Sequence, residues 1–244
     1  MPVLLIAIGL AILGSLGGIL LGSLLLLVRE ESRRKLVPWL VSYAVGTLLG
    51  VALLDVIPEA LESLKPAMVF GTLLCGILVF FILEKAVLWH HCHDDHCAEH
   101  AVAAAPLILI GHTVHNFIDG TVIAAATYVS IPLGVTTALA VAAHEIPQEV
   151  GDFAILLHAG YSRARALWLN ILSGSAATGG VLVASLAIGR LPHLLPYFLP
   201  VAAASFLYIA MSDLIPSLHH NPLEGGAVRQ ICLVGAGILT VVLL

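Results

Sequence analysis

Charged side chains are scarce in this sequence: Asp, Glu, Lys and Arg make up 10% of its 244 residues, and only 10 residues are Lys or Arg. So few cations provide no extended basic surface, which argues against nucleic acid as a partner. Four cysteines are too few for the disulfide framework of a small secreted domain. Hydrophobic residues, by contrast, make up 60% of the chain, and the mean hydropathy is +1.06. The composition therefore predicts an integral membrane protein in contact with the lipid bilayer rather than a cytosolic enzyme.

Eight apolar stretches are each long enough to cross a bilayer as a helix, which takes about 20 residues. They lie at 3–28, 38–61, 66–89, 101–129, 132–160, 164–189, 194–218 and 225–244. The first stretch lacks the basic start of a signal peptide and exceeds its usual apolar length of about 7 to 15 residues, so it counts as a span. We expect an all-α fold with a single polytopic domain over residues 1–244.

The Lys and Arg residues are unevenly divided between the two sides of these spans. Eight follow spans one, three, five and seven, and only Lys65 and Arg190 fall on the other side. Because cytoplasmic loops hold an excess of Lys and Arg, both termini are expected outside the cell or in the periplasm. The compact loops and the lack of a transit segment favour a bacterial inner membrane.

A short motif, Asp-x-Ile-Pro, occurs at 55–58 in span two and again at 213–216 in span seven. These two spans run in opposite directions under the predicted orientation, so the repeat is inverted in the membrane. Inverted repeats are typical of transporters that alternate access around a site at the midplane. A chance match or a shared proline kink is the alternative explanation.

Spans four and five carry polar residues in positions where apolar ones are expected. At 100° per residue, His112, His115 and Asp119 share one face of span four, with Asn116 on its flank. Span five presents a second polar face, formed by His144, Glu145, Gln148, Glu149 and Asp152. The two spans are therefore expected to turn these faces toward each other.

The carboxylates on these faces need a compensating charge. Four of them near membrane depth would each cost about 2.5 to 3.5 kcal/mol, or about 10 kcal/mol together. Neither span contains Lys or Arg. Imidazole, carboxylate and amide oxygen suit zinc, with iron, manganese and cadmium as other candidates. We therefore predict a divalent-metal site between spans four and five and no organic cofactor.

Pro147 lies within the span-five cluster. It removes one helical hydrogen bond and frees the carbonyl of Ala143, so local unwinding suited to ion coordination is expected. An ordinary proline kink is the alternative.

Two strings in these spans resemble a known family. They read His-Asn-x-x-Asp-Gly at 115–120 and His-Glu-x-Pro-Gln-Glu-x-Gly-Asp-Phe at 144–153. Together they resemble the ZIP (Zrt/Irt-like) family of divalent metal transporters, and the second string is closest to its LIV-1 type. Gln148 departs from that type, which has a second His there, and an amide is a weaker ligand than imidazole.

The resemblance implies a two-metal centre, a homodimer, and an elevator-like shift of spans one, four, five and six against the others. One metal site would consist of His115, Asp119, His144 and Gln148. The adjacent site would consist of Asn116, Glu145 and the shared Asp119, with Glu149 as a further candidate. Along the pathway, Asp55 stands where LIV-1 members often carry His, and Asn170 where some relatives supply a carboxylate. Further pathway candidates are His112, Asp152 and His158, the last of which an interfacial position explains equally well.

The segment between spans three and four, residues 90–100, has a metal-binding composition. Its candidate ligands are His90, His91, Cys92, His93, His96, Cys97 and His100. The predicted orientation places it in the cytoplasm, where thiols stay reduced. We interpret it as a receiver or sensor for the exiting metal; a Cys92–Cys97 disulfide and a purely solvated loop are the alternatives.

These observations favour zinc uptake into the cytoplasm by a membrane transporter. A proton-coupled metal exporter is the alternative within transporters, because carboxylate and His chains also relay protons. An intramembrane metalloprotease would need the His-Glu-x-x-His motif, which Gln148 breaks at its second ligand. A membrane receptor with a structural metal is the remaining alternative.

Overall fold

The structure, a computed structural model, describes residues 2–25, 27–89, 100–220 and 226–244. Within these ranges the chain is helical and contains no strand. Six helical segments are long and apolar enough to cross a membrane: Pro2–Leu25, Lys35–Ser63, Pro66–Lys85, Arg163–Arg190, Pro192–His219 and Gly226–Leu243. The prediction of an all-α membrane protein is confirmed. Helices α6 (His100–Val129) and α7 (Ile131–His158), which carry the polar faces, are not among the six, so the count of eight crossings stays a prediction.

The other helices follow the predicted spans within a few residues. Span one comprises α1 (Pro2–Ala11), η1 (Ile12–Leu16) and α2 (Gly17–Leu25). Span two comprises α3 (Glu30–Gly50), η2 (Val51–Val56) and α4 (Ile57–Ser63), and span three is α5 (Pro66–Trp89). Span six comprises α8 (Arg163–Gly174) and α9 (Ala176–Arg190). Span seven comprises η3 (Pro192–Leu194), α10 (Leu195–Ile209), η4 (Ala210–Leu214) and α11 (Ile215–His220), and span eight is α12 (Gly226–Leu243).

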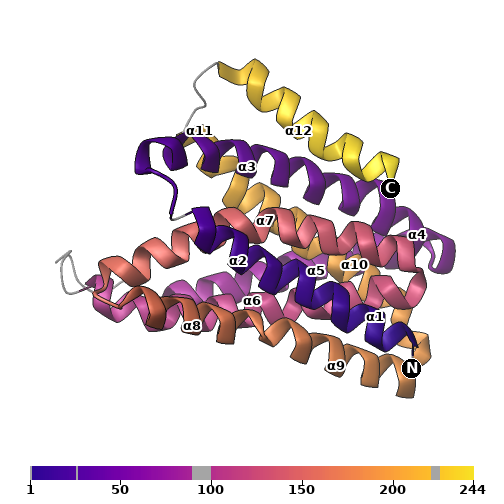
Figure 1. Cartoon of the computed structure of the whole chain (residues 1–244). Coiled ribbons are helices and arrows are strands. Elements are labelled where there is room, and N and C mark those ends of the chain that lie inside the picture. Colours follow the sequence, from indigo (N-terminus) through magenta and orange to yellow (C-terminus); the bar gives the residue numbers. More distant parts are fainter. Residues whose placement is uncertain (1, 26, 90–99, 221–225) are drawn as a thin grey trace.

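The helices lie roughly along one direction, and α1 begins at the same end of the bundle where α12 ends (Figure 1). Helix α6 packs against α1, α7, α8 and α9, while α2 packs against α7. On the other side, α3 packs against α12, and α10 against α5. Contacts of α7 with α3 and of α6 with α10 join the two groups. The elevator-like shift of spans one, four, five and six against the others stays a prediction.

Both Asp-x-Ile-Pro segments adopt the same local structure. Asp55 lies in the π-helical segment η2 and Asp213 in the π-helical segment η4, and each is followed by an α-helix with proline as its second residue. Proline lacks an N–H, so the carbonyl four residues earlier loses its α-helical partner, and a wider π turn accommodates the change. The inverted symmetry of the two spans stays a prediction.

The unwinding expected at Pro147 is wrong. Helix α7 remains α-helical from Ile131 to His158 with Pro147 inside it. Proline costs the helix one hydrogen bond, and tight packing against neighbouring helices keeps the remaining bonds in place.

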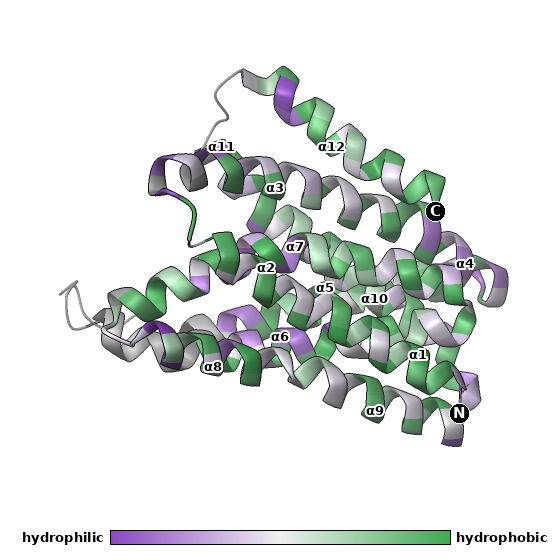
Figure 2. Cartoon of the chain, in the orientation of Figure 1, coloured by the Kyte–Doolittle hydropathy of each residue, from purple (hydrophilic) through white to green (hydrophobic). Residues whose placement is uncertain are grey.

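Apolar residues cover the outer helices, and hydrophilic stretches of α6 lie in the middle of the bundle (Figure 2). Large side chains of α5 and α12, among them Phe70, Ile82 and Ile231, are exposed. A helix whose exposed surface is apolar is suited to lipid, which confirms that the chain is an integral membrane protein.

Glycines bring α6 and α9 into backbone contact. A Cβ atom at Gly180 would lie 2.0 Å from the carbonyl oxygen of Phe117, and one at Gly120 would lie 1.9 Å from the carbonyl oxygen of Ala177. Such close approach between membrane helices depends on small residues. Helix α6 is therefore held at a fixed depth beside α9.

We expect Gly180→Ala to lower the melting temperature of the detergent-solubilised protein, because the new methyl group must push α6 and α9 apart at a cost of about 1 to 3 kcal/mol. Gly179→Ala is the matched control, since its Cβ would lie 3.8 Å from the nearest side-chain atom. The control should leave the melting temperature unchanged or raise it slightly. Equal melting temperatures for the two variants would contradict the close packing.

Candidate metal centre

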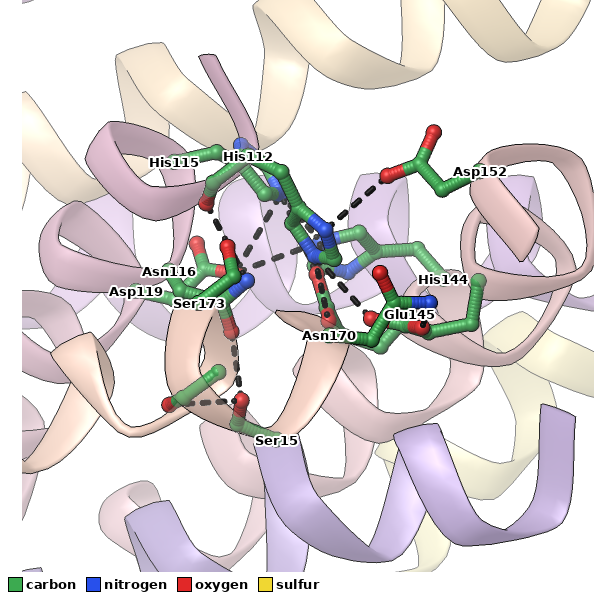
Figure 3. A network of polar contacts seen from close by, with 12 residues as sticks. Ser15, His112, His115, Asn116, Asp119, His144, Glu145, Asp152, Asn170 and Ser173 are labelled. Atoms are coloured by element: carbon green, nitrogen blue, oxygen red, sulfur yellow. Dashed lines mark hydrogen bonds and ion pairs between the residues drawn. The ribbon is translucent and has the colours of Figure 1, made fainter. Parts of the chain in front are cut away.

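A single-residue turn brings the two polar faces together. Ser130 caps the start of α7, where its side chain accepts a hydrogen bond from the backbone N–H of Leu133 at 3.3 Å. Since α6 ends at Val129, the chain reverses at once, and the two helices pack side by side in opposite directions. The pairing predicted from the sequence is thereby achieved (Figure 3).

The first cluster consists of His115 and Asp119 from α6 and His144 and Glu145 from α7. The two His Nε2 atoms lie 3.1 Å apart, and each is 3.4 Å from Asp119 Oδ2. Glu145 Oε1 lies 3.4 Å from His115 Nε2 and 3.9 Å from His144 Nε2. Asp119, His144 and Glu145 are fully buried. Four potential ligand atoms thus converge on one point inside the membrane domain.

These separations can be compared with the needs of a zinc ion. Zinc binds His nitrogen and carboxylate oxygen at about 2.0 to 2.1 Å with tetrahedral geometry, which places neighbouring ligand atoms about 3.3 Å apart. The cluster has separations of 3.1, 3.4, 3.4, 3.4 and 3.9 Å. A zinc ion therefore fits among the four side chains with small adjustments.

A second cluster adjoins the first and consists of His112, Glu145 and Glu149. His112 Nε2 lies 3.3 Å from Glu145 Oε2 and 3.2 Å from Glu149 Oε1. Its other ring nitrogen, Nδ1, lies 2.9 Å from Asp152 Oδ2. Glu145 belongs to both clusters, since it turns Oε1 toward the first and Oε2 toward the second.

Neighbouring helices hold the remaining polar atoms. Asn170 on α8 donates from Nδ2 to Glu149 Oε2 at 2.8 Å. Asn116 donates to the backbone carbonyl of His112 at 3.1 Å and accepts a hydrogen bond from the Ser15 hydroxyl of η1. His144 contacts the carbonyl of Ala140 through Nδ1 at 3.0 Å, which leaves Nε2 directed at the first cluster.

The other predicted residues are placed as follows. Gln148 is partly buried one turn after His144, and its role as a ligand stays a prediction. Asp55 is partly buried in η2 and interacts with the Thr136 side chain of α7, and it is a member of neither cluster. His158 ends α7 and His100 begins α6. The remaining predicted ligands of segment 90–100 lie outside the described residues.

Sequence reasoning assigned no functional part to Ser15. Its contact with Asn116 joins residues 101 positions apart in the chain. The signal in the sequence is the run of small residues at 14–18, which allows two helices to approach closely.

A stripe of glycines in span one lies directly behind the carboxylates. A Cβ atom at Gly18 would lie 2.8 Å from Cβ of Glu145, and one at Gly22 would lie 2.8 Å from Cβ of Glu149. Gly14 similarly lies close to the carbonyl oxygen of Ala138. The absence of side chains at these positions lets span one fix the depth of both carboxylates.

Comparison with known proteins shows which family has this sequence. The sequence profile of the family described as "ZIP Zinc transporter" matches residues 88–244. Zinc transporter ZIP13 of Pongo abelii is 34% identical over 235 residues, which cover 89% of this chain and 69% of that protein. The chain belongs to the ZIP family. Zinc transporter YKE4 of Saccharomyces cerevisiae is 30% identical over 233 residues, with 83% of this chain and 67% of the relative covered. Zinc transporter ZIP4 of Mus musculus is 47% identical over 112 residues, or 46% of this chain and 17% of that protein.

Membership of the ZIP family makes this chain a membrane transporter of divalent metal and not an enzyme. The similarity to ZIP4 agrees with the LIV-1 character of the motif in α7. The three relatives named here are eukaryotic, so a bacterial inner membrane stays a prediction.

We expect Gly18→Val to weaken zinc binding by at least about 10-fold, because its Cβ would lie 2.8 Å from Cβ of Glu145 and push this ligand out of place. Gly17→Val in the same helix is the matched control, since no atom lies within 4 Å of a Cβ at Gly17. Isothermal titration of both purified variants with zinc checks the difference. Wild-type affinity in Gly18→Val would show that span one does not position Glu145.

Proposed function

We propose that this ZIP protein takes up a divalent cation, most simply zinc, into the cytoplasm through the site between α6 and α7. The observation that carries the proposal is the first cluster, in which the two His nitrogens lie 3.1 Å apart and 3.4 to 3.9 Å from the two carboxylate oxygens, near the roughly 3.3 Å between ligand atoms of tetrahedral zinc. Gln148 is proposed as a further ligand, and Asn116, with Glu145 and Asp119, as the ligand set of the second ion that the family resemblance implies.

The energetics of burial support a transported cation. Asp119, Glu145 and Glu149 have at most 1% of their surface exposed, and three such carboxylates at membrane depth would cost roughly 8 to 10 kcal/mol if nothing offset their charge. No Lys or Arg occurs between residues 101 and 162. The imidazoles that contact these acids carry a positive charge only when protonated. A divalent cation supplies the missing positive charge without an added side chain.

Release requires that the site open to one side at a time. The block of α1, α2 and α6–α9 is proposed to move as a unit against α3–α5 and α10–α12, because its members pack against one another. Both termini are proposed to lie outside, with the 90–100 segment in the cytoplasm as a metal receiver. We further propose that two copies of the chain form a homodimer.

The proposal predicts the effect of removing single ligands on transport. In proteoliposomes loaded with a zinc indicator, Asp119→Ala and His144→Ala should each lower zinc uptake by at least about 10-fold, since each loses a direct ligand. Glu62→Ala and His193→Ala are the matched controls, because both residues are exposed at helix ends. Addition of zinc on either face of oriented vesicles tests the direction. Unchanged zinc flux in both ligand variants would contradict the assignment of Asp119 and His144 as ligands.

A further inference from the structure

Ser15 lies where three helical segments meet, and Figure 3 shows its side chain between two oxygens. Its hydroxyl contacts Oδ1 of Asn116 on α6 and the backbone carbonyl of Gly174, the last residue of α8, at 3.1 Å in the second case. The Ser15 and Asn116 side chains are both fully buried. Ser15 therefore connects span one to a residue that the family resemblance implies as a metal ligand.

The backbone at Ser15 differs from that of a regular α-helix. Ser15 belongs to the π-helical segment η1, and no proline occurs between residues 3 and 28. Within the described residues, the π-helical segments η2 and η4 are each followed by a helix with proline as its second residue. A π turn frequently marks a functional position in a helix. The π turn of span one thus has no proline beside it, and it contains the residue that contacts Asn116.

The amide group of Asn116 is held at both ends. Its nitrogen Nδ2 donates to the backbone carbonyl of His112 at 3.1 Å, and its oxygen Oδ1 accepts the hydrogen bond from Ser15. Two hydrogen bonds at opposite ends fix the plane of the amide. Because an amide oxygen has two lone pairs, Oδ1 keeps one of them for a cation while it accepts from Ser15.

The Gly174 carbonyl offers the same hydroxyl a second acceptor. It lies at the junction of α8 and α9, where the N–H of Thr178 donates to the carbonyl of Ser175 at 3.1 Å. A hydroxyl has one proton, so Ser15 donates to one of its two oxygens at a time. A cation at Asn116 Oδ1 makes that oxygen a poorer acceptor. The proton can then turn to Gly174, so that no buried donor is left without a partner.

We propose that Ser15 is a positioning residue for the transported cation: its hydroxyl orients the Asn116 amide before the cation binds and turns to the Gly174 carbonyl once Oδ1 is a ligand. This rests on the proposed function, in which Asn116 binds the second ion. Hydrogen bonds to metal ligands orient them, and the loss of one lowers metal affinity by about 10- to 100-fold. Span one then contributes to the site without supplying a ligand itself.

Glycine packing, and not the Ser15 hydroxyl, sets the distance between span one and α7. A Cβ atom at Gly14 would lie 3.3 Å from the carbonyl oxygen of Ala138, and one at Gly18 would lie 2.8 Å from Cβ of Glu145. Both contacts remain when the hydroxyl of Ser15 is removed. Ser15→Ala therefore changes the orientation of Asn116 while span one stays in place.

Calorimetric titration of the purified full chain with zinc tests the proposal. Asn116→Ala identifies the binding step that depends on Asn116. Ser15→Ala should weaken this step by about 10-fold and leave the other step unchanged, because only Asn116 loses its orientation. The double variant Ser15→Ala/Asn116→Ala should bind zinc as Asn116→Ala does. Ser23→Ala is the matched control in span one, since Ser23 donates to the Ile19 carbonyl of its own helix at 2.7 Å, and it should bind zinc as the wild type does.

Unchanged or tighter binding at the Asn116-dependent step of Ser15→Ala would overturn the proposal. A further loss of affinity in the double variant, or equal weakening of both steps in Ser15→Ala, would also overturn it, because either result indicates a general structural role. In each of these cases Asn116→Ala still weakens zinc binding, and the proposed function stands. Wild-type binding by Asn116→Ala would instead contradict the assignment of Asn116 as a ligand and, with it, the role of Ser15.

Discussion

Three carboxylates buried beside three imidazoles inside a lipid-facing helix bundle impose the constraint on which this structure depends. Each acid would destabilise the folded chain if its charge were left alone at membrane depth. In this structure the oxygens of Asp119, Glu145 and Glu149 face His nitrogens at 3.2 to 3.4 Å. Those separations suit a bound cation. Without the cation, the buried carboxylates raise the free energy of this conformation, so cation binding can shift the balance between conformations, as a carrier requires.

The surrounding helices pack closely against α6 and α7 and so hold the buried acids in place. Gly18 and Gly22 let span one reach the backbone side of Glu145 and Glu149, and Gly120 and Gly180 let α9 reach α6. In a membrane such contacts replace the hydrophobic effect as the source of helix association, because lipid is as apolar as the helix surfaces. The block that carries both clusters is therefore held together in part by backbone proximity, and it meets the other helices through the contacts of α7 with α3 and of α6 with α10.

Proline acts differently in different spans. Beside Asp55 and Asp213 it coincides with π-helical turns, whereas α7 continues as an α-helix through Pro147. The residue type alone predicts a lost hydrogen bond in all three cases. Packing decides the rest: α7 is enclosed by α2, α3 and α6, which restrict how far its backbone can adjust.

The sequence by itself determined the membrane class, the helical spans and the pairing of polar faces on α6 and α7, because apolar length and the 100° helical period are local properties of the chain. The sequence also showed the two motifs, at 115–120 and 144–153, that carry the resemblance to the ZIP family. Only the tertiary structure decided which atoms converge. His112 joins Glu145 and Glu149, Asn170 arrives from α8 and Ser15 from η1. Helical periodicity fixes a residue's direction around its own axis, but contacts between helices also depend on their depth and rotation relative to each other, which glycine packing sets.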